Sequence, residues 1–191
     1  MGFALPITPL QILWVNMVTA VTLSLAFAFT QRDSSIMMHP PVPATARLFS
    51  NSSIFSFVIH MAIISLGTIG TFIYEMEESS NLSLSHTVTI NMLVFFQIYY
   101  LWGLFLTRQS LKASTLTSYL PLIICTFAVL LLQVFFTYNP WMQGIFYTQG
   151  IGVEEWLQIA TFSSIIFAYL FIEATIGKSF FRRTVTIWDW Y

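Results

Sequence analysis

The sequence predicts an all-α fold, a polytopic bundle of five membrane-spanning helices with its N-terminus outside and its C-terminus in the cytoplasm. Of 191 residues, 57% are hydrophobic and only 8% are charged, whereas a soluble domain carries about 25% charged residues. Five apolar stretches are long enough to cross a bilayer, and the charges divide between alternate connections. This composition argues against a soluble enzyme, a disordered chain or a nucleic-acid-binding protein. It makes the lipid bilayer the first expected partner.

Each of the five stretches holds the roughly 20 apolar residues needed to cross a hydrocarbon core of about 30 Å. They are residues 10–29, 54–74, 87–107, 120–138 and 156–176. We predict helices because each backbone N–H group in lipid must be satisfied within its own segment. Neither an internal repeat nor a change in composition divides the chain, so we predict one domain over residues 1–191.

The charge distribution predicts the direction of the five helices. All seven basic residues fall in the two connections on one side of the membrane or after the fifth span: Arg32, Arg47, Arg108, Lys112, Lys178, Arg182 and Arg183. The other connections hold five acids: Glu75, Glu77, Glu78, Glu154 and Glu155. Because basic residues are retained in the cytoplasm, we expect the C-terminus there and the N-terminus outside.

A chain that starts outside needs a way to insert its first span. The residues before that span include no Lys or Arg, which a signal peptide would have. We therefore expect that a preceding helix leads into this span, or that the chain is part of a longer protein.

Polar residues inside the spans are candidates for either helix packing or ion binding. Asn16 and Thr19 are spaced i, i+3 and should share one face of the first helix. In hydrocarbon they must face protein or water, so they serve as interhelical hydrogen-bond partners or as oxygen ligands for a hard cation. Gln97 in the third span has the same two interpretations.

We expect the other polar and small residues of the spans to have structural roles. We expect His60 to be a hydrogen-bonded interhelical histidine and Gly67 and Gly70 to permit close helix contact. Three further side chains are expected to be structural or interfacial: Asn91, Gln133 and Glu173. The histidines lie in different segments and the connections are too short for a catalytic domain, so no catalytic residue and no metal site is assigned.

Four segments carry a resemblance to a known family. Residues 5–19 read LPITPLQILWVNMVT, residues 35–41 read SIMMHPP, residues 89–97 read TINMLVFFQ, and residues 154–157 read EEWL. In this order and spacing they resemble membrane helices six to ten of P-type cation-transporting ATPases of the calcium-pump type. The resemblance implies the same topology as the charge distribution.

The resemblance also implies roles for particular residues. Asn16, Thr19 and Gln97 fall on positions that line the cation pathway, and helix six would be unwound near them. Ala20 stands where the family's key Asp would be, and Gln97 stands where the calcium pump has an acidic ligand. Because a divalent site normally gathers carboxylates, a monovalent ion, a proton or no transported ion is more compatible with this chain than calcium.

The parent family uses ATP and Mg²⁺, but this chain is expected to need no cofactor and to be no enzyme by itself. Neither Asp33 nor Asp189 is followed by Lys, so the family's phosphorylated Asp-Lys-Thr-Gly motif is absent. We interpret the chain as a C-terminal transport module of the plasma or inner membrane. Its expected partners are the remaining pump helices and cytoplasmic domains, in cis or as a separate chain. It would be a domain excerpt, a split subunit or a degenerate gene product.

Two alternatives stay open at this point. The chain could be a stand-alone scaffold or regulatory remnant that binds another helical membrane protein through the small residues of the second span. It could also be an unrelated small channel or carrier, although it has little intramembrane charge.

Overall fold

The computed structural model describes residues 5–28, 51–108 and 116–184, and it contains no strand within these ranges. The helices are α1 (Pro9–Ala28), α2 (Asn51–Ser79), α3 (Leu82–Arg108), α4 (Leu116–Tyr138), α5 (Pro140–Phe146) and α6 (Val153–Thr184). Among the described residues, five helices are long and apolar enough to cross a membrane. The predicted all-α bundle with five spans is therefore confirmed.

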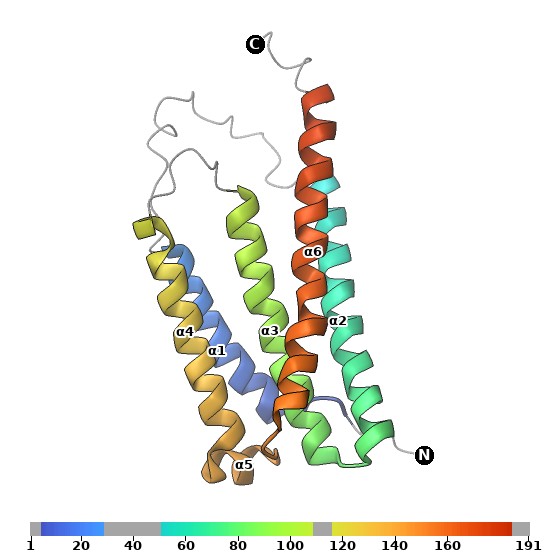
Figure 1. Cartoon of the computed structure of the whole chain (residues 1–191), viewed down its shortest axis with the longest axis vertical. Coiled ribbons are helices and arrows are strands. Elements are labelled where there is room, and N and C mark those ends of the chain that lie inside the picture. The colour runs from blue at the N-terminus through green and yellow to red at the C-terminus, as the bar shows by residue number, and fades with distance from the viewer. Residues whose placement is uncertain (1–4, 29–50, 109–115, 185–191) are drawn as a thin grey trace.

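Helix α3 is the centre of the bundle (Figure 1). Helices α1 and α4 pack on one side of it, and α2 and α6 pack on the other. Successive long helices run in opposite directions, so α1, α3 and α6 all begin at the same end. The molecule thus has two sides that share one central helix: an α1–α4–α5 side and an α2–α6 side.

An aromatic cluster holds the α1–α4–α5 side together. The rings of Trp14 and Phe136 stack at a centroid distance of 5.3 Å, and Phe146 lies 5.7 Å from Trp14 and 5.1 Å from Phe136. All three residues are buried, and they belong to one core cluster. Because lipid is as apolar as these rings, their close packing rather than their removal from water stabilises this side.

Small residues let the helices of the α2–α6 side approach α3 closely. A Cβ atom added at Gly67 would lie 2.5 Å from Phe96 Cζ, and one at Gly103 would lie 2.4 Å from Leu170 Cδ1. The predicted close helix contact is therefore confirmed at Gly67. It is wrong at Gly70, where an added Cβ would meet nothing within 4 Å.

The turn between α2 and α3 is shorter than the sequence predicted. We expected the spans to end at residue 74 and restart at residue 87, but α2 reaches Ser79 and α3 begins at Leu82. Ser80 adopts a left-handed φ of 52°, and the Asn81 side chain accepts hydrogen bonds from the backbone N–H groups of Ser83 and Leu84. Charged residues end the hydrophobic stretch of α2, but they do not end the helix. The Asn81 cap, in contrast, marks the start of α3.

The connection between α4 and α6 contains α5, a short helix that we did not predict. The Asn139 side chain accepts a hydrogen bond from the Trp141 N–H group at 2.9 Å, and Pro140 follows it at the first helical position. Tyr147 ends α5 in a left-handed conformation with φ of 54°. An Asn-Pro pair is a common helix start, so the sequence did contain the signal for α5.

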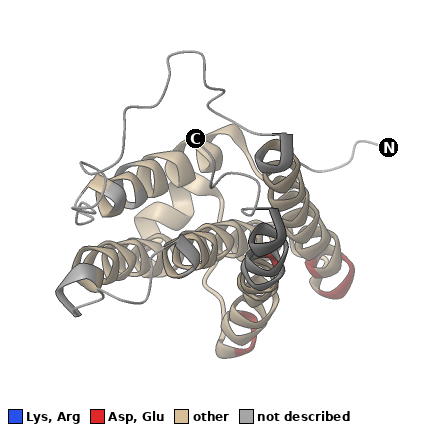
Figure 2. Ribbon diagram, turned by 90° about the horizontal axis from the view of Figure 1, so that it is seen from above, with Lys and Arg blue, Asp and Glu red and all other residues tan. Residues whose placement is uncertain are grey.

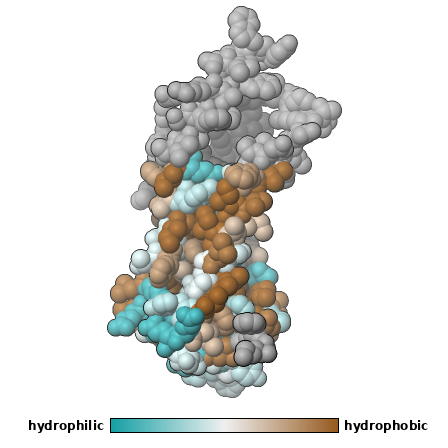
Figure 3. Space-filling view, turned by 90° about the vertical axis from the view of Figure 1, so that its right-hand side faces the viewer, coloured by the Kyte–Doolittle hydropathy of each residue, from teal (hydrophilic) through white to brown (hydrophobic). Residues whose placement is uncertain are grey.

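Acidic and basic residues lie at opposite ends of the bundle, as the sequence predicted. The acids gather where α2 ends and α6 begins, at residues Glu75, Glu77, Glu78, Glu154 and Glu155 (Figure 2). Arg108 ends α3, and Lys178, Arg182 and Arg183 lie in the last turns of α6, at the other end. Arg32, Arg47 and Lys112 are outside the described residues. On the α2–α6 side, apolar side chains cross the middle of the molecule, with hydrophilic ones below (Figure 3).

Candidate cation pathway

Two of the three predicted pathway residues lie on α1, at the border between its covered and uncovered faces. Thr19 is 5% exposed, and its hydroxyl group donates to the Val15 carbonyl oxygen of the same helix at 2.7 Å. Asn16 is exposed. The i, i+3 spacing brings the two residues to neighbouring positions, but only Asn16 is open to a partner outside the bundle.

The third predicted residue, Gln97, lies on the central helix α3 and is half-buried. Its Oε1 atom is buried and has no hydrogen-bond partner within the described residues. In the same part of the chain, no hydrogen bond joins Gln97 to Asn16 or Thr19. The assignment of these three residues to one pathway therefore stays a prediction.

Helix α1 is continuous where the family resemblance implied an unwound segment. It is α-helical from Pro9 to Ala28, and the Thr19 and Thr22 hydroxyl groups donate to the carbonyl groups of Val15 and Val18 one turn earlier. The sequence has no Gly or Pro between Leu10 and Ala28 that would break the backbone hydrogen bonds. The expectation of an unwound helix is thus wrong for this five-helix structure.

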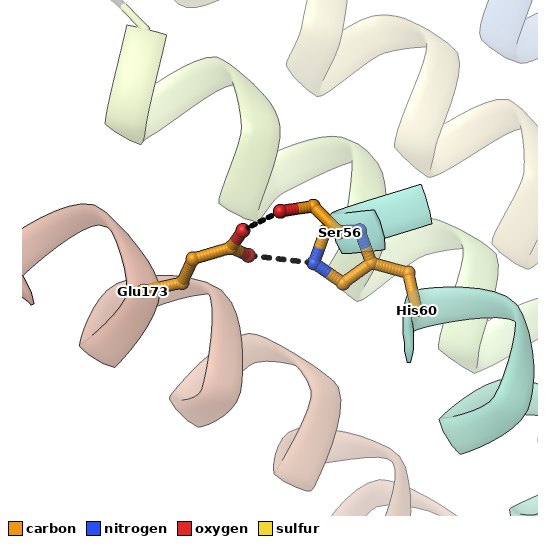
Figure 4. A network of polar contacts seen from close by, with 3 residues as sticks. All are labelled: Ser56, His60 and Glu173. Atoms are coloured by element: carbon orange, nitrogen blue, oxygen red, sulfur yellow. Dashed lines mark hydrogen bonds and ion pairs between the residues drawn. The ribbon is translucent and has the colours of Figure 1, made fainter. Parts of the chain in front are cut away.

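A polar network joins α2 to α6 (Figure 4), and the sequence did not reveal which residues pair in it. His60 Nε2 lies 2.8 Å from Glu173 Oε2, and the Ser56 hydroxyl group donates to Glu173 Oε1. The His60 ring is 6% exposed and lies edge-on to the rings of Tyr100 and Tyr169. The expected interhelical hydrogen bond of His60 is confirmed, as is the structural interpretation of Glu173.

The sequence indicated which residues could form this network, but it did not indicate which of them pair. Ser56 and His60 are spaced i, i+4 on α2, and Glu173 is an acid within the last span. Ionisable residues inside a membrane pair with one another. His60 and Glu173 are 113 residues apart in the sequence, so only the fold could show that they meet.

Two amide side chains tie the other side of the bundle together. Gln11 Nε2 donates to the Phe146 carbonyl oxygen at 2.8 Å, which fastens α1 to α5. Asn91 Nδ2 donates to the Thr137 hydroxyl oxygen at 3.1 Å, which links α3 to α4 and confirms the structural interpretation of Asn91. Gln133 is fully buried on α4, and both of its amide atoms lack a hydrogen-bond partner in the described part of the chain.

The described helices contain no cluster of metal-binding side chains. Within residues 5–28, 51–108 and 116–184, no three His, Cys, Asp or Glu side chains gather in a way that could hold a metal ion. The three candidate pathway residues, Asn16, Thr19 and Gln97, carry neutral oxygen atoms and no carboxylate.

Comparison with known proteins gives one family and a consistent set of relatives. The family described as "Cation transporting ATPase, C-terminus" matches residues 4–176. The probable cation-transporting ATPase F of Mycobacterium tuberculosis (strain ATCC 25618 / H37Rv) is 29% identical over 159 residues, which are 83% of this chain and 18% of that protein.

Two further relatives also match most of this chain over a small part of their own length. Cation-transporting ATPase pma1 of Synechocystis sp. (strain ATCC 27184 / PCC 6803 / Kazusa) is 25% identical over 80% of this chain. The calcium-transporting ATPase of Bacillus subtilis (strain 168) is 26% identical over 86% of this chain. In both cases the chain spans 18% of the relative's length. These matches confirm the resemblance and exclude an origin as an unrelated small channel.

Proposed function

Because this chain belongs to the family of C-terminal membrane domains of cation-transporting ATPases, we propose that it forms one half of a P-type pump's ion pathway. Helices one to five and the cytoplasmic domains of the pump complete it, in cis or as a separate chain. ATP and Mg²⁺ act on those domains, and this chain hydrolyses no ATP by itself. The absence of an Asp-Lys pair at Asp33 and Asp189 supports this division of labour.

The single observation that carries the proposal is the uncovered face of α1. Asn16, Ala20 and Ser24 are spaced i, i+4, i+8, and all three are exposed. On this face the three residues form a small and polar stripe at the depth of the hydrocarbon core, beside exposed large apolar residues such as Leu13 and Met17. Polar groups at that depth pack against protein or water rather than lipid, so the face is suited to contact other helices of a pump.

The pathway residues act as neutral ligands in this proposal. The Asn16 amide and the Thr19 hydroxyl group supply oxygen atoms from α1, and Gln97 supplies a buried oxygen atom from α3. Since Ala20 offers no carboxylate, charge compensation must come from the missing helices or the ion must be monovalent. A monovalent cation or a proton is therefore the proposed cargo.

The proposed orientation in the membrane follows from the opposite charges at the two ends of the bundle. The acidic end, with Glu75 and Glu155, lies outside, and the end that carries Arg108 and Lys178 lies in the cytoplasm. The proposed location is the plasma or inner membrane. A reporter fused after Tyr191 should be active only on the cytoplasmic side.

Reconstitution with the missing half tests the function. The purified chain alone should show no cation-dependent ATP hydrolysis. Combined with helices one to five and the cytoplasmic domains of a P-type pump, it should support such activity. Asn16→Ala should lower the combined activity at least about tenfold, since one ligand contact is lost in the transport step.

An exposed lipid-facing residue on α4, Phe127→Ala, is the matched control and should leave that activity unchanged. ATP hydrolysis by the isolated chain would contradict the proposal. So would a chain that assembles with the missing half but supports activity equally well with and without Asn16.

A further inference from the structure

A groove lies between α2 and α6. It is on the side of the molecule whose middle is apolar (Figure 3). It has a volume of about 320 Å³, and Gly67 and Gly70 of α2, Phe96 of α3 and Phe162 of α6 line it. All of these residues lie within candidate membrane spans. The groove therefore opens sideways into hydrocarbon rather than into water.

The sequence builds the groove with two glycines of different roles. Gly67 lets the Phe96 ring come within van der Waals reach of α2, because a Cβ atom there would lie 2.5 Å from Phe96 Cζ. Phe96 is 2% exposed and forms the floor. Gly70 lies one turn later, where an added Cβ would meet nothing within 4 Å, so its missing side chain leaves the space open.

The rims of the groove are suited to a lipid chain. Leu66 is 70% exposed on one rim, and Phe162 and Ile165 are 50% and 55% exposed on the other. A flexible acyl chain fills a narrow apolar groove of this kind without leaving any backbone group unsatisfied. Helix α1 packs on α3 and α4, on the other side of the bundle, so the groove lies away from the α1 face that we propose as the pump interface.

Apart from Thr71, the groove is polar only at its lower end, near the acidic end of the bundle. Tyr74 and Gln158 line it there. Glu78 follows Tyr74 by one turn of α2, and Glu75 of α2 and Glu155 of α6 lie at the same acidic end of the bundle. Carboxylates at the level of the lipid headgroups attract the ammonium group of a zwitterionic headgroup and repel a headgroup whose net charge is negative.

We propose that this groove binds one acyl chain of a phospholipid whose headgroup carries an amine. The chain lies on Phe96 between α2 and α6, and the ammonium group lies near Tyr74 and Glu78. Phosphatidylethanolamine has this chemistry. This site is separate from the proposed cation pathway, and it does not depend on whether the chain transports an ion.

Lipid counting by native mass spectrometry tests the proposal on the full chain purified in detergent. Phosphatidylethanolamine and phosphatidylglycerol with identical acyl chains are titrated separately. The wild-type chain should retain one phosphatidylethanolamine with about fivefold higher affinity than phosphatidylglycerol. Gly70→Leu should abolish that binding by filling the groove, while the control Gly144→Leu, at another open glycine on α5, should not.

The headgroup part of the proposal has its own variant pair. Glu78→Gln should remove the preference for phosphatidylethanolamine, whereas Glu77→Gln, one position away on a different face of α2, should keep it. A photoactivatable group on the acyl chain provides a measurement that needs no variant. It should label peptides that contain Phe96 or Phe162.

Three results would overturn the proposal. One is equal retention of phosphatidylethanolamine by Gly70→Leu and the wild-type chain. Another is photolabelling spread over the outer helices without enrichment at the groove. The third is a change in oligomeric mass instead of lipid count in Gly70→Leu, which would show that a helix rather than a lipid occupies the groove.

Discussion

The two sides of the bundle share the central helix α3, and both expose large apolar residues, but α1 adds a row of small and polar ones. On the α1–α4–α5 side, aromatic rings and an amide-to-backbone hydrogen bond fix α1. Its uncovered surface combines Asn16, Ala20 and Ser24 with large apolar residues such as Leu13 and Met17. On the α2–α6 side, a side-chain network joins the helices, and the free face shows large apolar residues such as Leu66 and Ile165.

This difference indicates what each surface meets in a membrane. Apolar residues are at home against lipid, whereas a polar stripe at the same depth needs protein or water. We therefore propose that further pump helices pack on the α1 face that carries Asn16 and that lipid covers the α2–α6 face. Four experiments can break or sharpen this comparison.

The largest effect is expected in the aromatic cluster. Phe136→Ala should lower the free energy of unfolding in detergent by about 3 kcal/mol, because Phe136 is fully buried against Trp14 and Phe146 and its loss leaves a cavity. Thermal unfolding followed by circular dichroism measures this change. Phe127→Ala, which removes a ring that is 61% exposed, should change stability by less than about 0.5 kcal/mol. Equal effects of the two variants would show that the cluster does not stabilise this side.

A smaller effect is expected when the polar network of the other side is broken. His60→Ala should lower the free energy of unfolding by about 2 kcal/mol, because it leaves the Glu173 carboxyl group without one of its two partners inside the membrane. A double-mutant cycle with Glu173→Gln isolates the pair. A coupling energy near zero would mean that the two groups meet without stabilising the contact between α2 and α6.

The two glycines of α2 provide a matched pair with opposite expectations. Gly67→Ala should destabilise the fold by about 1–3 kcal/mol, since its Cβ would press on the buried Phe96 ring. Gly70→Ala should be neutral or stabilise the helix by up to about 1 kcal/mol, because its Cβ meets open space. Chemical unfolding of both variants under one set of conditions compares them directly. If Gly67→Ala were tolerated as well as Gly70→Ala, the close contact of α2 with α3 would be refuted.

The spans and the distribution of charge were predictable from the sequence because they depend on local composition. Twenty apolar residues cross a membrane whatever their neighbours are, and that decides the number of helices. The helix ends were less predictable, since Glu75 and Glu78 continue α2 although they end its apolar stretch. Here the Asn81 cap, rather than hydropathy, sets where α3 begins.

The pairing of side chains was not predictable, because it depends on helix rotation and on contacts between distant segments. Neither His60 nor Glu173 indicates its partner in the sequence, although each is conspicuous in an apolar helix. The candidate pathway residues Asn16, Thr19 and Gln97 stay a prediction, since their proposed ligand geometry depends on helices that this chain does not contain. Motif resemblance located them, and only assembly with those helices can test them.

The central claim is that the polar face of α1, unlike the α2–α6 face, is covered by other pump helices. Nitroxide labels at Asn16→Cys and Ile172→Cys, each in a Cys125→Ala background, report the access of oxygen dissolved in the bilayer to each position. Both residues are exposed in this bundle, with Ile172 55% exposed on α6. When helices one to five and the cytoplasmic domains are added, oxygen access should fall several-fold at position 16 and stay unchanged at position 172. Unchanged access at position 16 in the assembled pump would contradict the account.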